Sequence, residues 1–462
     1  MTAISKQSSR PFRFPFRIHP LRRSIVQMQK IYLSAIVVVT LAAFGCNEGN
    51  VTPPAPPITT PVEKVPVVKD DDAASVTALE EAGFLLTKND SGNVIAASMH
   101  SDADISAVLV HLAGIPNAET VTFSGPGISD AGMENLTKLD GVKRLHLSDS
   151  AIGDETLKAV AELKGLQVLS LRRTGVTDAG LEVITGLPAI RAIDLRNSNI
   201  ADDGLTHLAK MITLSDIQLE KSKVTDDGVA KLTTLSLKNI NLNYCTSISN
   251  ESMKVIGGMK TLEGIQLDYT KVTDEGMTHV AGLSKLKRLR IRGCDVSGAG
   301  LAHIAKLTNM QRLELRDSSL DDAGLEVISQ LPNVNYLDMS ECRIATPEGM
   351  KLLGKLTKLT YLGFWETKLN DEAFNEFGNL TAIEELNLKS ANIFDDSIPT
   401  ILKMTKLKKL NLAGTQVTDD GFKQLAQLPD LVELNVANTS IGFDVIDELA
   451  EKEGLKVVEF EN

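Results

Sequence analysis

The sequence is poor in aromatic residues, cysteine and basic charge, and each shortage excludes a class of protein. Aromatic residues make up 4% of the chain, with a single Trp, so any core must be built from aliphatic side chains. Four cysteines in 462 residues are too few for a disulfide scaffold. Lys and Arg number 48 against 60 Asp and Glu, and this acidic balance argues against a nucleic-acid partner. A hydrophobic content of 43% excludes a fully disordered chain.

Long apolar runs are also missing, but the N-terminus has the composition of an export signal. Residues 1–45 contain seven basic residues and no acidic ones, and they include an apolar run at 31–44. This run is shorter than the roughly 20 residues that a membrane-spanning helix needs. A basic start, a short apolar run and small residues at its end are typical of a secretory signal. We therefore predict an export segment at 1–45 in a periplasmic or cell-surface protein.

Gly45 is followed directly by Cys46, which resembles the end of a bacterial lipoprotein signal. The resemblance implies that Cys46 is lipidated, becomes the mature N-terminus and anchors the protein to a membrane, either the inner or the outer one. A plain signal peptide cleaved nearby, an uncleaved anchor, and a twin-arginine signal at Arg22-Arg23 are the alternatives. Translation could start at Met1 or at Met28. Residues 46–73 are rich in proline and predict an extended linker that holds a folded domain away from the membrane.

The rest of the chain is an internal repeat, and this pattern determines the expected fold. Twelve of the fifteen intervals between units are 24 residues, and positions 4 and 6 of each unit are apolar. We predict an N-terminal cap at 74–93, about 15 units at 94–454 and a terminal strand at 455–462. The units begin at Val94, Ala118, Val142, Leu166, Ile190, Leu214, Leu237, Leu262, Leu286, Met310, Val334, Leu359, Ile383, Leu407, Leu431 and Leu455.

The consensus L-x-x-L-x-L-x-x-[TSC]-x-[VI]-[TS]-D-x-G-L resembles the leucine-rich repeat family, in particular its ribonuclease-inhibitor-like superfamily. It is also similar to the repeats of exported bacterial leucine-rich-repeat proteins and of F-box substrate receptors. The resemblance implies an α/β fold, a right-handed solenoid with a parallel sheet on its concave face and short helices outside. No F-box-like segment precedes the array, so a ubiquitin-ligase receptor is a poor match.

The physics of the unit agrees with this fold. Apolar residues at positions 4 and 6 alternate with polar ones, as in a strand with one buried face. Asp recurs at position 13, where we expect it to cap the N-terminus of the following helix. Gly two residues later should allow close packing of the turn. Position 9 holds Thr, Ser or one of Cys245, Cys294 and Cys342 in most units, which predicts a buried internal ladder of small side chains.

We find no sequence signature of catalysis, of a metal site or of a cofactor site. The chain has no GxSxG, P-loop, GxGxxG or HExxH motif. His100 and His146 should face the inside of the arc, with no Ser or Cys nucleophile expected in register with them. We therefore predict a protein that is not an enzyme.

Function should lie on the concave face, which positions 2, 3, 5, 7 and 8 of each unit should line. Aromatic residues, otherwise scarce, cluster there in the middle and later units, together with Arg side chains, and both are enriched at binding hot spots. The predicted partner-binding residues are Tyr244, Tyr269, Arg288, Arg290, Arg292, Arg312, Arg316, Tyr336, Tyr361 and Trp365.

We expect this surface to bind a protein partner, which makes the chain a scaffold of the bacterial cell envelope. An adhesin or glycan-binding module is the alternative, in which the aromatic rings stack on the sugars of a polysaccharide. A third interpretation is structural: the charges pair across strands and the rings stack only to steady the sheet.

Overall fold

The computed structural model describes residues 69–460, which lie within one compact unit that spans Pro66–Asn462. The predicted export segment at 1–45, the predicted lipidation of Cys46 and most of the predicted linker at 46–73 fall outside the described residues. None of the helices within residues 69–460 is both long and apolar enough to cross a membrane.

A hairpin and a helix begin the described chain. Helix α1 (Ala73–Glu81) is followed by β1 (Leu85–Lys88) and β2 (Val94–His100), and these two strands pair antiparallel. Asp72 caps α1, because its carboxylate accepts a hydrogen bond from the Ser75 N–H at 2.9 Å. From β2 onward every pairing is parallel, beginning with β3 (Thr120–Ser129).

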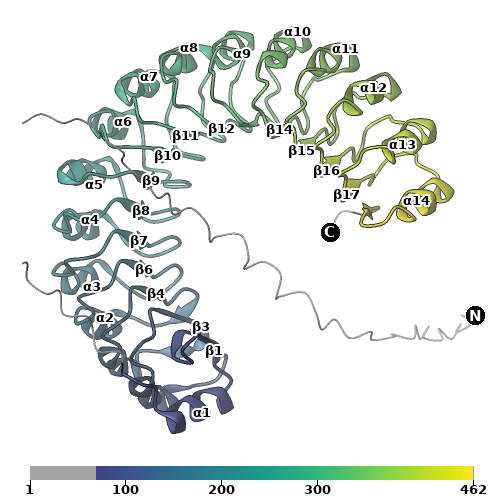
Figure 1. The fold of residues 1–462 in the computed structure, drawn as a ribbon. Helices are drawn as coiled ribbons and strands as arrows, with labels where there is room; N and C mark the ends of the chain where they lie inside the picture. Colours follow the sequence, from purple (N-terminus) through teal and green to yellow (C-terminus); the bar gives the residue numbers. More distant parts are fainter. Residues whose placement is uncertain (1–68, 461–462) are drawn as a thin grey trace, which may run out of the picture. The chain divides into compact units, whose positions relative to one another are not determined.

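Each later repeat contributes one short strand to the inside of an arc and one short helix to its outside (Figure 1). The strands after β3 are β4 (Arg144–His146), β5 (Ser150–Ala151), β6 (Val168–Ser170), β7 (Ala192–Asp194), β8 (Asp216–Gln218), β9 (Asn239–Asn241), β10 (Gly264–Gln266), β11 (Arg288–Arg290), β12 (Arg312–Glu314), β13 (Tyr336–Asp338), β14 (Tyr361–Gly363), β15 (Glu385–Asn387), β16 (Lys409–Asn411), β17 (Glu433–Asn435) and β18 (Lys456–Val458).

The outer elements are short α-helices, some of them preceded, continued or replaced by a 3₁₀ segment. The α-helices are α2 (Asp154–Val160), α3 (Asp178–Val183), α4 (Asp202–Leu208), α5 (Asp226–Ala230), α6 (Asn250–Ile256), α7 (Asp274–Met277), α8 (Gly298–Leu301), α9 (Asp322–Ser329), α10 (Pro347–Met350), α11 (Asp371–Phe374), α12 (Ile398–Ile401), α13 (Asp419–Leu425) and α14 (Phe443–Ala450). The 3₁₀ segments are η1 (Ser106–Gly114), η2 (Met133–Lys138), η3 (Lys231–Thr234), η4 (Thr278–Gly282), η5 (Ala302–Ile304), η6 (Lys351–Lys355), η7 (Asn375–Phe377) and η8 (Asp395–Ser397).

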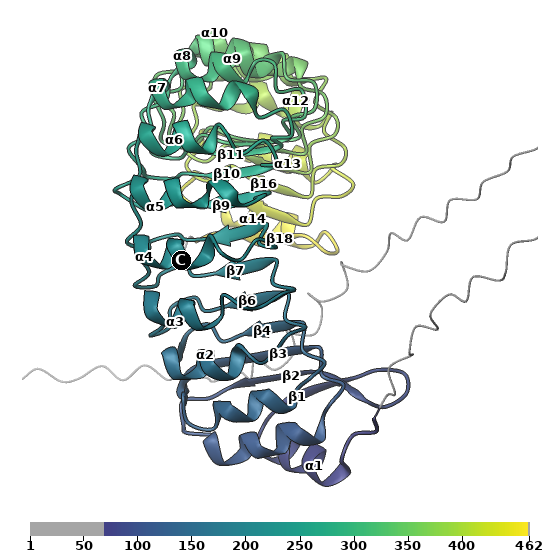
Figure 2. The same cartoon turned by 90° about the vertical axis from the view of Figure 1, so that its left-hand side faces the viewer.

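Register follows the repeat as far as β17. Residues at position 4 pair directly with one another in successive strands, for example Leu313 with Leu337 and Leu337 with Leu362. Their side chains and those at position 6 are buried between the sheet and the helices in the units from Ala118 to Leu431. At β18 the register shifts by one residue relative to the predicted unit, because Leu434 pairs with Val457, and Phe460 at the predicted position 6 is exposed. Figure 2 shows the strands stacked one above the other, with the helices lying along one side of the sheet that they form. The predicted solenoid fold is confirmed.

The prediction that Asp at position 13 caps its own helix is wrong. These aspartates are the first residues of their helices, and the carboxylate instead reaches the next coil along the chain. Asp202 Oδ1, for example, accepts a hydrogen bond from the backbone N–H of Thr225 at 2.8 Å, and its Oδ2 accepts one from the Thr225 hydroxyl at 2.6 Å. We call this contact the Asp staple. It recurs from Asp130 to Asp419 and satisfies a backbone donor at the start of the following helix.

The Asp staple also explains the glycine two residues after each Asp. A Cβ on Gly228 would lie 2.2 Å from Asp202 Oδ1, and a Cβ on Gly180 would lie 2.2 Å from Asp154 Oδ1. The glycine therefore makes room for the carboxylate of the preceding coil. Where this position is not Gly, a hydroxyl can take its place: Ser252 donates to Asp226 Oδ1 at 2.5 Å through its side chain.

The position-9 ladder is present as expected, with a difference in how it is bonded. A Thr hydroxyl such as that of Thr270 donates to the carbonyl of its own coil, here Leu267, at 2.8 Å. The Cys294 thiol instead contacts the Leu267 carbonyl of the preceding coil at 3.1 Å. Burial raises the pKa of the Cys342 thiol to about 11, so this sulfur behaves as a core atom and not as a nucleophile.

We predict that Asp202 and Gly228 are energetically coupled. Asp202→Ala should destabilise the array by about 1–2 kcal/mol because charge-assisted hydrogen bonds are lost. Gly228→Ala alone should cost about 1–3 kcal/mol through the clash with the carboxylate. In the double variant the clash is absent, so its cost should be clearly less than the sum of the two, as measured by urea unfolding.

Gly186→Ala is the matched control for this cycle, because a Cβ there would meet nothing within 4 Å. It should leave the unfolding midpoint unchanged. Strictly additive effects of Asp202→Ala and Gly228→Ala would contradict the explanation given for the D-x-G spacing.

Candidate functional site

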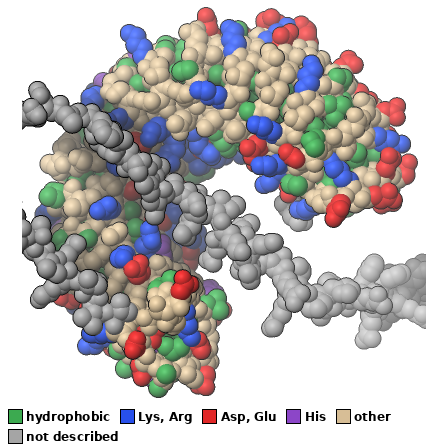
Figure 3. Space-filling model, in the orientation of Figure 1, with side chains coloured by type: hydrophobic (Ala, Val, Ile, Leu, Met, Phe, Trp, Pro, Cys, Tyr) green, Lys and Arg blue, Asp and Glu red, His purple; other side chains and the backbone are tan. Residues whose placement is uncertain are grey.

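Side chains at positions 3 and 5 of each repeat face the inside of the arc. Figure 3 shows Lys and Arg side chains gathered along this inner side. The predicted partner-binding residues occupy two places there: Arg288, Arg290, Arg312, Tyr336 and Tyr361 lie on the strands, and the others lie just after a strand, at positions 7 and 8. Whether these residues bind a partner stays a prediction.

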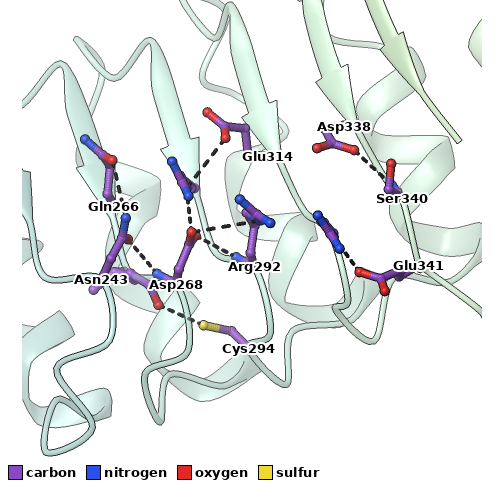
Figure 4. Close-up of polar contacts among 12 residues, drawn as sticks. Asn243, Gln266, Asp268, Arg292, Cys294, Glu314, Asp338, Ser340 and Glu341 are labelled. Carbon is purple, nitrogen blue, oxygen red and sulfur yellow. Dashed lines mark hydrogen bonds and ion pairs between the residues drawn. The ribbon is translucent and has the colours of Figure 1, made fainter. Parts of the chain in front are cut away.

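Asp268 is the centre of a polar network on this face (Figure 4). Its side chain is fully buried, and Oδ2 lies 2.5 Å from Arg290 Nε. Oδ1 accepts a hydrogen bond from the Arg292 backbone N–H at 3.1 Å, while Asn243 Oδ1 receives the Asp268 N–H at 2.8 Å. Burial raises the pKa of the Asp268 carboxyl, although Arg290 opposes this shift. The Arg290 guanidinium is therefore occupied by its ion pair with the Asp268 carboxylate.

Most other charges on the inner face are paired as well. Arg312 Nε lies 2.7 Å from Glu314, which also approaches Arg290, and Arg316 pairs with Glu341. The same holds in earlier coils. The pairs there are Lys287–Glu263 at 2.7 Å, Arg196–Asp194 at 2.8 Å, Arg172–Asp149 at 2.5 Å and Arg173–Asp149 at 2.8 Å. For these residues the structural interpretation of the charge pattern applies.

Two depressions hollow the inner face. The larger, about 550 Å³, lies over β6 and β7, and small side chains such as Ser170 and Ala192 form its floor. The smaller, about 310 Å³, lies over Gly264 of β10. Its charged lining residues are Arg288, Arg290, Arg312, Asp216 and Glu314. Asp216 and Gln218 line both depressions, so the two adjoin each other across the coils, and we call them together the groove.

Tyr244 and Tyr269 stand at position 8 of consecutive coils in left-handed backbone conformations, with φ of 58° and 53°. This conformation costs a non-glycine residue roughly 1–2 kcal/mol. Their rings stack with centroids 4.9 Å apart, and both residues are 36% exposed. Lys221 lies over Tyr244 at 5.0 Å, and a Cβ on Gly293 would touch the Tyr269 ring at 2.3 Å. The ring faces are thus covered, and only the edges and hydroxyls are open.

The second aromatic cluster is more enclosed. The Tyr336 and Tyr361 rings are parallel within 5° at 4.0 Å, and the Arg312 guanidinium lies 3.5 Å from the centroid of Tyr336. Arg316 and Lys389 both lie over the Trp365 ring, at 4.3 and 4.9 Å. Burial raises the pKa of Tyr361. These rings form a stack that crosses from β13 to β14.

That stack lies where the Asp staple fails. Pro347 occupies the place of the stapling Asp, and among residues 69–460 no side chain from this coil bonds the start of α11 in the usual way; Asn370 caps α11 itself through the Ala373 N–H at 3.0 Å. On the outside, Lys351 joins Glu348 at 2.8 Å to Glu372 at 2.7 Å. We conclude that Tyr336, Tyr361 and Trp365 brace this junction.

The prediction that His100 and His146 lack a Ser in register is wrong: Ser124 pairs with His100, and Ser170 pairs with His146, each on the next strand of the sheet. His100 Nδ1 is 3.0 Å from Ser124 Oγ, and Asp102 is 4.0 Å from His100 Nε2. Asp102 is too far to orient the ring by a hydrogen bond, and its side chain is 85% exposed, so this trio lacks the positioning that activates a nucleophile. Within the described chain no group of three His, Cys, Asp or Glu side chains is arranged to hold a metal ion.

Sequence reasoning missed the groove, although a signal for it was present. Gly264 is the only glycine at position 3 of the units from Ala118 to Leu455, where the other units carry a side chain that covers the sheet. A glycine at that place breaks the inner surface and leaves a gap. The positions of aromatic and basic residues could not reveal the groove, because a groove forms where the side chains are small or absent.

Comparison with known proteins agrees with the observed fold. A family model described as "Leucine-rich repeat region" matches residues 126–347, and another, "Leucine Rich repeat", matches 403–426. An internalin (inlF) of Listeria monocytogenes is 18% identical over 85% of this chain and 96% of its own, with a TM-score of 0.42. A leucine-rich-repeat protein of Leptospira interrogans is 18% identical over 75% and 91%, with a TM-score of 0.51. No curated protein sequence matches the chain significantly.

The two aromatic clusters should respond differently to mutation. Tyr361→Ala should destabilise the array by about 1–3 kcal/mol, because it removes ring stacking at a junction without an Asp staple. Tyr269→Asn should change stability by less than about 0.5 kcal/mol or raise it, since Asn tolerates the left-handed conformation. Urea unfolding midpoints measure both effects. Equal losses in the two variants would contradict this division of the aromatic residues.

Proposed function

Since the chain belongs to the leucine-rich repeat family, we propose that it is a non-catalytic protein-interaction scaffold of the bacterial cell envelope. Its partners bind inside the arc, on the groove over β6 to β12. The observation that carries this proposal is that the two depressions adjoin each other along the inner face. Side chains of seven neighbouring repeats line them between Val168 and Arg312, which gives the groove the length to accept a segment of another protein.

The covered aromatic rings favour a protein partner over a polysaccharide. Sugar rings stack on open aromatic faces, but neighbouring cations, rings or backbone cover the faces of Tyr244, Tyr269 and Trp365. What the inner face offers instead is hydrogen-bonding groups and charge, such as Asp216, Gln218 and Arg288. These groups suit the backbone and side chains of a polypeptide.

We also propose that the protein is exported and membrane-anchored through a lipid on Cys46. The sequence at residues 1–46 supports this: a basic start, a short apolar run and Gly45-Cys46. The proline-rich residues that follow would set the arc away from the bilayer, so that its inner face is open to a partner.

Cys46→Ser should release the protein from the membrane fraction, because the thiol that carries the lipid is absent. Fractionation of the expressing bacteria, followed by immunoblotting, measures this. Cys294→Ser is the control, since Cys294 is buried in the array, and that variant should stay with the membrane. A Cys46→Ser protein that remains in the membrane fraction would favour an uncleaved anchor instead.

Blocking the groove should abolish partner binding. Ala192→Arg places a long side chain on the floor of the larger depression without touching the core. Ala179→Arg makes the same change on the exposed side of α3, outside the arc. With immobilised protein and an envelope extract, we expect the partner to be retained by the Ala179→Arg variant and lost from the Ala192→Arg variant. Retention by both variants would place binding outside the groove.

A further inference from the structure

Arg288 lies in an unusual place on the inner face. It belongs to β11, and its side chain turns back across Gly264 of β10 to reach β9, where its Nη2 donates a hydrogen bond to Asn239 Oδ1 at 2.6 Å. A Cβ on Gly264 would lie 3.3 Å from Arg288 Nε and 2.7 Å from Asn239 Oδ1. The glycine is therefore what allows the guanidinium to lie across the sheet.

The partner of Arg288 differs from those of its neighbours. Arg290, Arg312 and Arg316 each pair with a carboxylate. For Arg288, no carboxylate among residues 69–460 lies within 4.0 Å, and its hydrogen bond goes to a neutral amide. Glu263, just before β10, is held by Lys287 at 2.7 Å. The two carboxylates that line the gap also have other partners: Asp216 accepts from Asn239 at 2.8 Å, and Glu314 pairs with Arg312 at 2.7 Å. Arg288 is thus an exposed cation without a counter-charge in contact, fixed over an open gap.

The gap itself can receive a side chain from outside. It measures about 310 Å³ and adjoins the larger depression at Asp216 and Gln218. Asn239 Nδ2 already donates to Asp216 Oδ2 at 2.8 Å, so Asn239 keeps a hydrogen-bond partner if its carbonyl loses Arg288. The exchange of this single contact leaves the surrounding network intact.

We propose that Arg288 anchors an Asp or Glu side chain of a protein partner bound in the groove. The carboxylate enters the gap over Gly264 and replaces Asn239 Oδ1 as the acceptor of the guanidinium. A charge-assisted hydrogen bond is roughly twice as strong as one to a neutral amide, so the exchange is favourable. This inference rests on the proposed function and specifies the partner: an extended, acidic segment of polypeptide.

The test uses a fluorescein-labelled peptide of alternating Glu and Gly residues, and a matched peptide with Gln in place of Glu. Fluorescence anisotropy at low ionic strength measures their binding to the intact protein. We expect the Glu peptide to bind, the Gln peptide not to bind, and Arg288→Gln to weaken the Glu peptide by about fivefold or more, with a reduced dependence on salt.

Arg144→Ala is the matched control. Arg144 is an exposed arginine at the same repeat position, on β4, and it does not line either depression. It should leave binding of the Glu peptide unchanged. Gly264→Ala fills the gap while keeping Arg288, and it should weaken the Glu peptide as Arg288→Gln does. Thermal melts of all three variants check that the array stays folded.

Three results would overturn the proposal: no binding of the Glu peptide, equal binding of both peptides, or an equal loss in Arg144→Ala and Arg288→Gln, which would show general attraction to positive charge. The proposed function is tested by a different experiment, the capture of a partner by the Ala192→Arg and Ala179→Arg variants. If Ala192→Arg abolishes partner capture and Arg288→Gln does not, the groove binds a protein but Arg288 is not its anchor.

Discussion

The array depends on one contact repeated along its outer edge: in most coils an Asp carboxylate satisfies the backbone at the start of the next helix. The sheet hydrogen bonds on the inside join adjacent coils, but they leave the helix starts on the outside without partners. The Asp staple solves this problem and binds the coils at a second line of contact. Gly228 and its equivalents have no side chain because the carboxylate of the preceding coil fills that space. A single interaction thus explains two of the most regular residues of the repeat, the Asp at the start of the helix and the Gly two residues later.

The sequence was sufficient to predict the fold, but it was insufficient to predict which side chains contact one another at the site. Periodicity located strands, helices and buried positions, because burial requires apolar residues at a regular spacing and this spacing is visible in the sequence. It could not assign the acceptor role of Asp202, since a cap for its own helix and a staple for the next one need the same residue at the same place. Nor could it show that Arg288 lies across two strands, because the direction of a long side chain depends on the free space around it. Gly264 was the one residue in the sequence that indicated such free space on the inner face.

The scarce aromatic residues now divide into two groups with different physical roles. Tyr336, Tyr361 and Trp365 are enclosed and lie at the junction where Pro347 stands in place of the stapling Asp, and the Tyr336 and Tyr361 rings stack across that junction. Tyr244 and Tyr269 are half-open and hold a backbone conformation that Asn or Gly would adopt at less cost. Clustering in sequence therefore does not identify a binding surface by itself, because rings also collect where a repeat is weakest.

The Asp staple makes the joint between coils self-contained, and this has a consequence for the lineage of the molecule. Apart from the ends of the array and the units that have Gly298 or Pro347 in place of the Asp, each unit carries a donor group for the coil before it and an acceptor for the coil after it. A stretch of DNA that encodes one unit can therefore be duplicated or lost, and the new neighbours will still fit. The arc can change its length through copying errors at little risk to folding. The contact of Arg288 with Asn239 spans three successive units, and an added or deleted copy between them would separate its parts. Selection for binding would therefore hold the number and order of these units constant while the ends of the array remained free to vary.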